Sequence, residues 1–383
     1  MKSQKGSLWE VGMVLVLLLF VVMGCSDTGG GNGNPTGTGN LPADPGSGNL
    51  AGIVVGTIGG QPLVGVTVSA KGQTTTTDSE GTFELDGVGE GSFGVTISGN
   101  AVYLRTAAVN TANGRSVRLD AIEVNSAFNL GFYREIARGH HPNEGDLFQT
   151  HRWTNSTRPT FIIDTDASAT LDGVISQDQI NTVSEVLSKI VPVFTGGFYA
   201  SPTVKLQPFR QISLDLIPDN SFVITFDDSL ISIDAYGLTN TTPDFTASTT
   251  STINKTLIYL IDFSQMYQGI TFREVIAHES GHGFGFRHTS DILPSVMVAI
   301  GAFGGLYGDA DKLHMSIMYH RPAGNTDIDN DLVPGAKMMG QPLGVQVFID
   351  RRANFPKSPE LLERVRNLPS KIPRALLEQA ARY

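Results

Sequence analysis

Three of the chain's eight histidines lie within the stretch HESGHGFGFRH. His278 and His282 are four positions apart, and in a helix that spacing places both side chains on one face, about 6 Å apart along the axis. Two imidazoles arranged in this way can bind one metal ion. Glu279 lies on the neighbouring row of the helix surface, near the metal but not bound to it, which is the position that a general base requires.

A third histidine completes the candidate metal site. Gly285 can adopt the positive φ angle that ends a helix and reverses the chain, so that His288 can turn back toward the first two histidines. Three neutral imidazoles leave the fourth position of a tetrahedral zinc ion open for water, as in catalytic zinc sites. The alternatives are a glycine-rich helix end that carries histidines by chance, or a metal-free relic of such a site.

The pattern H-E-x-x-H-x-x-G-x-x-H resembles the motif of the metzincins, a clan of zinc peptidases. Its fixed positions are His278, Glu279, His282, Gly285 and His288. The resemblance implies a twisted, mostly parallel sheet, an active-site helix, and a cleft along the edge strand where a peptide binds in extended form. It also implies Zn²⁺ on the three histidines, with Glu279 taking a proton from the attacking water and passing it to the leaving amine.

Metzincins carry a methionine turn after the motif, and two segments compete for it. HTSDILPSVM resembles the matrixin group and makes Met297 the candidate, whereas SIMYHRP offers Met318 at a distance nearer that of serralysin-like members. We favour Met297, because DADKLHMSIMYH is typical of a helix. Either methionine would form an apolar floor under the histidines. Tyr319 or Tyr307 can be considered for oxyanion stabilisation, although a role in the core is favoured for both.

The elements that must position the motif are expected between residues 125 and 345. Apolar runs predict strands at about 160–166, 221–227 and 256–263, and an amphipathic pattern predicts a helix from about Gln177 to Val193. This order favours an α/β domain with the motif helix near its middle. The strand at 256–263 directly precedes the motif helix and is the candidate for the edge strand of a metzincin-like fold.

Residues 50–124 have a different pattern. Short runs of alternating apolar and polar residues are separated by glycine, Asp-Gly and Asn-Gly turns, which predicts a small antiparallel β-sandwich. The segment GQPLVGVTVSAKGQTTTTDSEGTFELDGV resembles the carboxypeptidase regulatory-like domain, a transthyretin-like sandwich. The expected fold is therefore multidomain, with an all-β spacer followed by an α/β catalytic domain.

The N-terminus indicates export. Lys2 and Lys5 precede an apolar run that ends in VVMGC, so residues 1–25 are expected to form a signal peptide. The sequence before Cys25 resembles a bacterial lipobox, which implies acylation of Cys25 and attachment to a membrane of the cell envelope. Residues 26–49 are rich in Gly, Asn and Pro and are expected to form a disordered tether.

Composition narrows the partners. Cys25 is the only cysteine, so the chain has neither a disulfide nor a thiolate that could mask the metal. The net charge of -10, without a cluster of basic residues, argues against nucleic acid. The tail at 346–383 predicts two short amphipathic helices separated by Pro369 and Pro373, for packing or oligomer contact; the sequence does not specify an oligomeric state.

Further polar clusters give weaker signals. His140, His141 and His151 are expected in a solvated linker, and His314 and His320 lie six apart, too far around a helix to form a pair.

Asp327, Asp329 and Asp331 alternate as in a calcium loop, and the metzincin resemblance allows structural Ca²⁺ there. However, Leu332 stands where an EF-hand requires glycine, which favours a charged surface loop.

Together these features predict an envelope-anchored zinc-dependent endopeptidase that hydrolyses extracytoplasmic proteins or peptides. The alternative is a binding or adhesion lipoprotein in which the sandwich is the working part and the zincin domain is inert.

Overall fold

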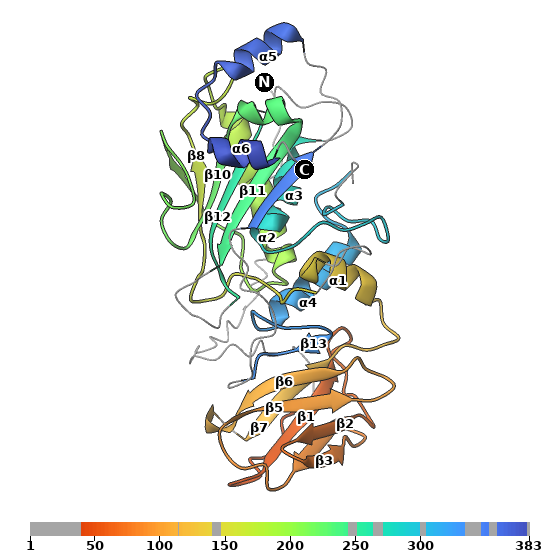
Figure 1. Ribbon diagram of the computed structural model, residues 1–383. Coiled ribbons are helices and arrows are strands. Elements are labelled where there is room, and N and C mark those ends of the chain that lie inside the picture. The colour runs from red at the N-terminus through yellow and green to blue at the C-terminus, as the bar shows by residue number, and fades with distance from the viewer. Residues whose placement is uncertain are drawn as a thin grey trace, which may run out of the picture. The chain divides into compact units, whose positions relative to one another are not determined.

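The computed structural model describes residues 40–113, 115–139, 147–243, 251–262, 271–298, 304–333, 346–351 and 358–380. The expected signal peptide, Cys25, most of the expected tether, and His140 and His141 lie outside these residues. The described residues have the mixed α and β content that the sequence predicts, and their strands form three sheets (Figure 1).

Short strands make up the N-terminal part. They are β1 (Leu50–Gly56), β2 (Thr67–Ala70), β3 (Gln73–Thr76), β4 (Thr82–Leu85), β5 (Ser92–Ser98), β6 (Arg105–Asn110) and β7 (Ser116–Ala121), with η1 (Thr111–Asn113) between the last two. Two sheets, β4-β1-β7 and β13-β6-β5-β2-β3, share one hydrophobic cluster formed by residues 50–121, where β13 is Asp329–Asn330. The second sheet thus takes a strand from far along the chain.

The strand directions correct one expectation. Most neighbours are antiparallel, but β1 pairs with β7 in parallel, so a purely antiparallel arrangement is wrong for this pair. A parallel pair requires a crossover rather than a hairpin, and β2 to β6 lie between these two strands in the sequence.

A six-stranded sheet forms the centre of the C-terminal part. Its strands, in the order β14-β11-β12-β10-β8-β9, are β14 (Gln346–Arg351), β11 (Ala235–Pro243), β12 (Ile253–Leu260), β10 (Ser221–Phe226), β8 (Thr160–Asp164) and β9 (Val204–Gln207). The last four strands in this order are parallel, whereas β11 runs antiparallel to β12 and β14 antiparallel to β11. Figure 1 shows the blue strand β14 beside β11.

The position of β12 differs from the sequence-based expectation. It lies between β11 and β10, so the expectation that the strand at 256–263 is the edge strand is wrong. Its apolar run Leu257–Leu260 is fully buried, as expected for a strand that is covered on both faces. On the side of β12 away from β10 lies β11, and β14 pairs with the edge of β11 that faces away from β12.

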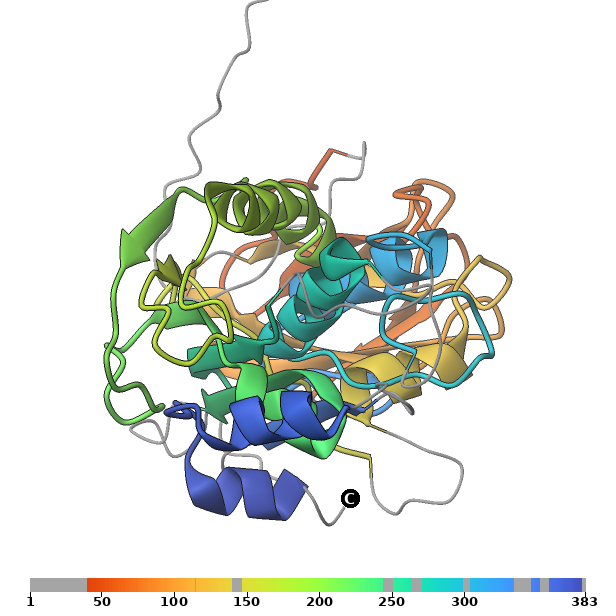
Figure 2. The same cartoon turned by 90° about the horizontal axis from the view of Figure 1, so that it is seen from above.

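Helices pack around this sheet. They are α1 (Leu130–Arg138), α2 (Gln177–Phe194), α3 (Phe272–Gly283), α4 (Asp309–His320), α5 (Pro359–Arg366) and α6 (Arg374–Ala380), with η2 (Asp228–Ile233). Capping boxes start both α2 and α3, which satisfies the free N–H groups of their first turns. Helices α2 and α3 pack together beside the sheet, whereas α5 and α6 contact η2 (Figure 2).

A buried ionic network joins the N-terminal strands to the segment after α4. Arg321 Nη1 donates to Asp120 Oδ2 at 2.6 Å, and its Nε donates to Asp329 Oδ1 at 2.7 Å. Arg105 Nη1 donates to the same Asp329 oxygen at 2.7 Å, and its Nη2 reaches Asp331 at 3.3 Å. The surface loop expected at these aspartates is therefore wrong: Asp329 and Asp331 are buried, because guanidinium groups compensate their charge.

The network predicts how stability depends on pH. Burial raises the pKa of Asp120, but the charges of Arg321 and Arg105 outweigh it and lower the pKa to about 2. Because the folded-state pKa is depressed, this stabilisation is present above the unfolded-state pKa of about 3.9 and is lost as the pH falls toward 2.

We expect Asp120→Asn to lower the free energy of unfolding by about 3 kcal/mol at pH 7, since it leaves a buried guanidinium undercompensated. The difference from wild type should shrink between about pH 4 and pH 2, as measured by urea unfolding. Glu90→Gln, which breaks an exposed pair with Arg115, is the control and should have little effect. A difference that is independent of pH would contradict the assignment.

Candidate metal centre

The three motif histidines converge on one point. The distance between the Nε2 atoms of His278 and His282 is 3.1 Å, and the Nε2 atom of His288 lies 3.3 Å from the first and 3.1 Å from the second. His278 and His282 are buried in α3, and His288 is half-buried in the segment that follows. Among the residues that the structure describes, these three are the group of His, Cys, Asp or Glu side chains that can hold a metal ion.

Hydrogen bonds fix the tautomers of two of these rings. The Nδ1 atom of His278 donates to the carbonyl oxygen of Val296 at 2.6 Å, and that of His282 donates to the carbonyl oxygen of Phe286 at 2.8 Å. The Nε2 atoms therefore carry lone pairs. Burial, together with the neighbouring His288 and His278, lowers the pKa of His282 well below its ordinary value, so its ring is neutral, which is the form that binds metals.

The donor set fits zinc. Nitrogens bound to one tetrahedral zinc ion at about 2.0–2.1 Å lie about 3.3–3.4 Å apart, close to the separations of the three Nε2 atoms. Lone pairs cannot hydrogen-bond to one another, so a cation between the three Nε2 atoms would relieve their repulsion. The carbonyl partners at Nδ1 are also the outer contacts that orient histidine ligands in zinc sites.

Gly285 makes the approach of His288 possible. Its φ angle is +98°, as the sequence predicts, and α3 ends two residues earlier at Gly283. A side chain at Gly285 would collide with the carbonyl oxygen of His151. The turn therefore requires glycine both for its backbone conformation and for this close approach.

Glu279 lies against β11. It is fully buried, and its Oε2 atom accepts a hydrogen bond of 2.5 Å from Thr239 Oγ1. A Cβ atom at Gly237 would overlap the Glu279 carboxylate, so β11 leaves room for that group only because this residue is glycine. No local pattern in the sequence points to Thr239 or Gly237, because both are far from the motif in the chain.

Met297 lies directly under the motif helix. It is fully buried, and a Cβ atom at Gly281, between the two helical histidines, would collide with its Sδ atom. Met318 lies in α4, which forms over the residues that the sequence predicts to be helical. Tyr319 is buried in the core and donates to the carbonyl oxygen of Phe284 at 3.0 Å, and Tyr307 packs near Phe194.

Asp311 is a supporting residue that the sequence analysis missed. Its carboxylate accepts from Ser295 Oγ at 2.5 Å, from the Val296 amide at 2.9 Å and from the Gly308 amide at 2.8 Å. Burial raises its pKa against the effect of these hydrogen bonds. Asp311 thereby fixes the backbone at Val296, whose carbonyl oxygen accepts from His278. Its identity as a buried acid at the start of α4 is visible only in the folded chain.

Two other described histidines, His151 and His314, are buried in the fold. His151 is buried, and burial lowers its pKa to about 3, so the solvated linker expected there is wrong for this residue. His314 accepts from the Asn129 amide at 2.9 Å and donates to the Ala310 carbonyl at 2.7 Å. Neither residue belongs to the group that can hold a metal.

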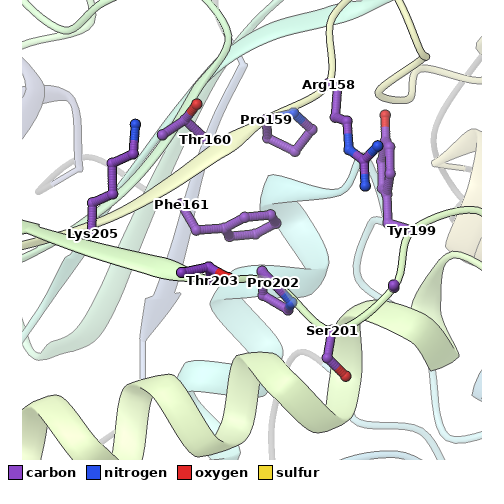
Figure 3. Close-up of a pocket in the computed structure, with 10 residues that line it drawn as sticks. Arg158, Pro159, Thr160, Phe161, Tyr199, Ser201, Pro202, Thr203 and Lys205 are labelled. Atoms are coloured by element: carbon purple, nitrogen blue, oxygen red, sulfur yellow. The ribbon is translucent and has the colours of Figure 1, made fainter.

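A surface pocket lies away from the histidines, at β8 and β9. Arg158 and Lys205 lie on opposite sides of it, and Phe161, Tyr199 and Pro202 contribute to its lining (Figure 3). No His, Cys, Asp or Glu side chain lines this pocket. It therefore offers no imidazole, thiolate or carboxylate ligand for a metal.

Comparison with known proteins does not identify a function for this chain. No protein-family model matches the chain, and no curated protein is significantly similar to it. Within the described ranges, no helix combines the length and the apolar character needed to cross a membrane. The function is therefore inferred from the site itself.

Asp311→Asn should weaken zinc binding about tenfold, because it perturbs the backbone that orients His278. The measurement is zinc competition with a chelating dye, combined with circular dichroism to check folding. Asp309→Asn removes the same charge from the same helix end, but the Asp309 side chain is 98% exposed and pairs with the nearby Lys312. Equal zinc affinities of the two variants would contradict the positioning role.

Proposed function

We propose that this chain is a zinc-dependent endopeptidase. The observation that carries the proposal is the convergence of three Nε2 atoms within 3.3 Å of one another, two of them on the helix that also carries the buried Glu279. Three neutral imidazoles and an adjacent carboxylate are the minimum set for hydrolysis with metal-activated water. The full metzincin-like spacing of the motif supports the same assignment.

The chemistry divides between the metal and the protein. A zinc ion on His278, His282 and His288 would lower the pKa of water and polarise the peptide carbonyl. Glu279 acts as general base: a carboxylate oxygen accepts the proton of the attacking water and later delivers it to the leaving amine nitrogen. The hydroxyl of Thr239, donating to Oε2, orients the carboxylate for this transfer.

An extended peptide is the substrate class that the geometry favours. Glu279 contacts Gly237 and Thr239 of β11, so a peptide that adds to the edge of this strand would run past the general base. Strand addition uses backbone hydrogen bonds, which every peptide can make, and leaves side-chain pockets to set specificity. We therefore propose unfolded or extended segments of proteins as substrates.

The proposed architecture follows from the same interpretation. Two separate hydrophobic clusters, formed by residues 50–121 and by residues from 122 onward, support a transthyretin-like spacer followed by a metzincin-like domain. Acylation of Cys25 would anchor both to a membrane of the cell envelope. The aspartates at 327, 329 and 331 contact arginines, so we do not include a calcium ion in the proposal.

Metal analysis and proteolysis test the proposal. The purified chain should contain about one zinc ion and cleave an unstructured protein such as casein, with loss of cleavage on chelation. Glu279→Gln should retain zinc but lower the cleavage rate at least about 100-fold, because it removes the proton acceptor and preserves the shape.

His288→Ala should lose zinc, whereas His314→Gln, which changes a buried histidine outside the site, should retain it. Equal cleavage by the Glu279→Gln variant, or absence of zinc from the wild type, would refute the peptidase proposal. Zinc bound without cleavage would favour the alternative, an envelope-anchored binding or adhesion protein.

A further inference from the structure

The edge of the sheet nearest the metal centre is occupied by the chain itself. Strand β14, residues 346–351, pairs antiparallel with β11 through a continuous register from Thr241↔Gln346 to Leu238↔Ile349, which then shifts near Ala235. The sequence predicts a helical tail over 346–383, and this prediction is wrong for residues 346–351, which form a strand. Because β11 lies between β12 and β14, its outer edge is not open to another strand in this state.

The register places β14 beside the general base. Phe348 lies opposite Thr239, and Asp350 lies opposite Gly237. These two β11 residues contact Glu279, one by a hydrogen bond and the other by close approach. Neighbouring strands are about 4.8 Å apart, so the backbone of β14 runs along the path that an extended substrate would follow past Glu279.

Phe348 also covers a metal ligand. Its ring stacks on the imidazole of His282, with a centroid distance of 4.2 Å and an interplanar angle of 3°. The guanidinium of Arg287 lies 5.9 Å from the same ring. Val347 and Ile349, which alternate with Phe348 along the strand, pack against the hydrophobic core. The segment is thus held both by backbone pairing and by side chains on its two faces.

The chain beyond β14 is anchored to the same sheet. Lys371 Nζ donates to Asp164 Oδ2 at 2.8 Å, and both side chains are buried. Asp227 Oδ2 accepts from the backbone amides of Lys371 at 2.6 Å and Ile372 at 3.1 Å. A tethered segment competes at an effective concentration in the millimolar range, which exceeds that of most free substrates.

We propose that residues 346–351 are an intramolecular occupant of the peptide-binding edge and keep the site closed until β14 leaves β11. This inference rests on the proposed function, since it assigns the role of the edge to which a substrate would bind. It also supplies a form of inhibition that requires no cysteine. A substrate peptide binds only to the fraction of molecules in which β14 is displaced, and its apparent affinity falls by that fraction.

Peptide binding tests the proposal without relying on catalysis. In full-length chains carrying Glu279→Gln, residues 346–351 are replaced by Gly-Ser-Gly-Ser-Gly-Ser, and binding of a fluorescent peptide of sequence QVFIDR is measured by polarisation. The replaced chain should bind the peptide at least about tenfold more tightly than the chain with its own β14. Replacement of residues 73–76 in the edge strand β3 by glycine and serine is the control and should not increase binding.

Equal binding by chains with and without β14 would overturn the proposal. In chains that retain Glu279, the same replacement should raise casein cleavage at least about tenfold. A gain in peptide binding without any cleavage would support the role of β14 as occupant of the β11 edge and would refute the peptidase function. The two hypotheses therefore fail separately.

A milder variant covers the case in which the replaced chain does not fold. Phe348→Ala removes the ring from His282 but leaves the β14 backbone, so a chelator such as 1,10-phenanthroline should extract zinc roughly fivefold faster. Phe148→Ala is the matched control, because the Phe148 ring lies 4.6 Å from the guanidinium of Arg287 and its loss removes a phenylalanine of the same size. Unchanged extraction from the Phe348→Ala variant would contradict the cover that β14 is proposed to provide.

Discussion

Two hydrogen bonds decide what the converging histidines can do. Donation from Nδ1 of His278 to Val296 and from Nδ1 of His282 to Phe286 leaves the lone pairs of the Nε2 atoms directed at a shared point. In a buried site, such lone pairs repel one another unless a cation or a shared proton lies between them. The surrounding structure, from Asp311 at the start of α4 to the turn after α3, holds these two carbonyl groups in place.

Close packing around α3 explains the glycines of the motif region. A side chain at Gly281 would collide with Met297, and one at Gly283 would meet the ring of Phe222 in β10. In strand β11, Gly237 leaves space for the carboxylate of Glu279. The motif helix therefore lies closer to the sheet and to the methionine below it than ordinary side chains permit.

Buried ion pairs attach the N-terminal strands and the C-terminal tail to the part of the chain that carries the motif helix. Arg321 and Asp120 join the N-terminal strands to the chain after α4, and Lys371 fixes the C-terminal tail to Asp164. Buried pairs of this kind add little net stability over apolar packing, but each is costly to break from one side, which favours a single arrangement. The tail attached in this way includes β14, so the occupant of the β11 edge belongs to the folded structure.

The sequence by itself determined the local features: the helix that carries His278 and His282, the positive φ angle at Gly285, the helix α2 and the apolar strands, because these depend on periodicity and on the conformational freedom of glycine. Only the tertiary structure decided which strand borders Glu279, that Asp311 supports His278, and that residues 346–351 cover the edge. Strand order and buried polar contacts join residues that are distant in the chain, and no local pattern encodes such partners.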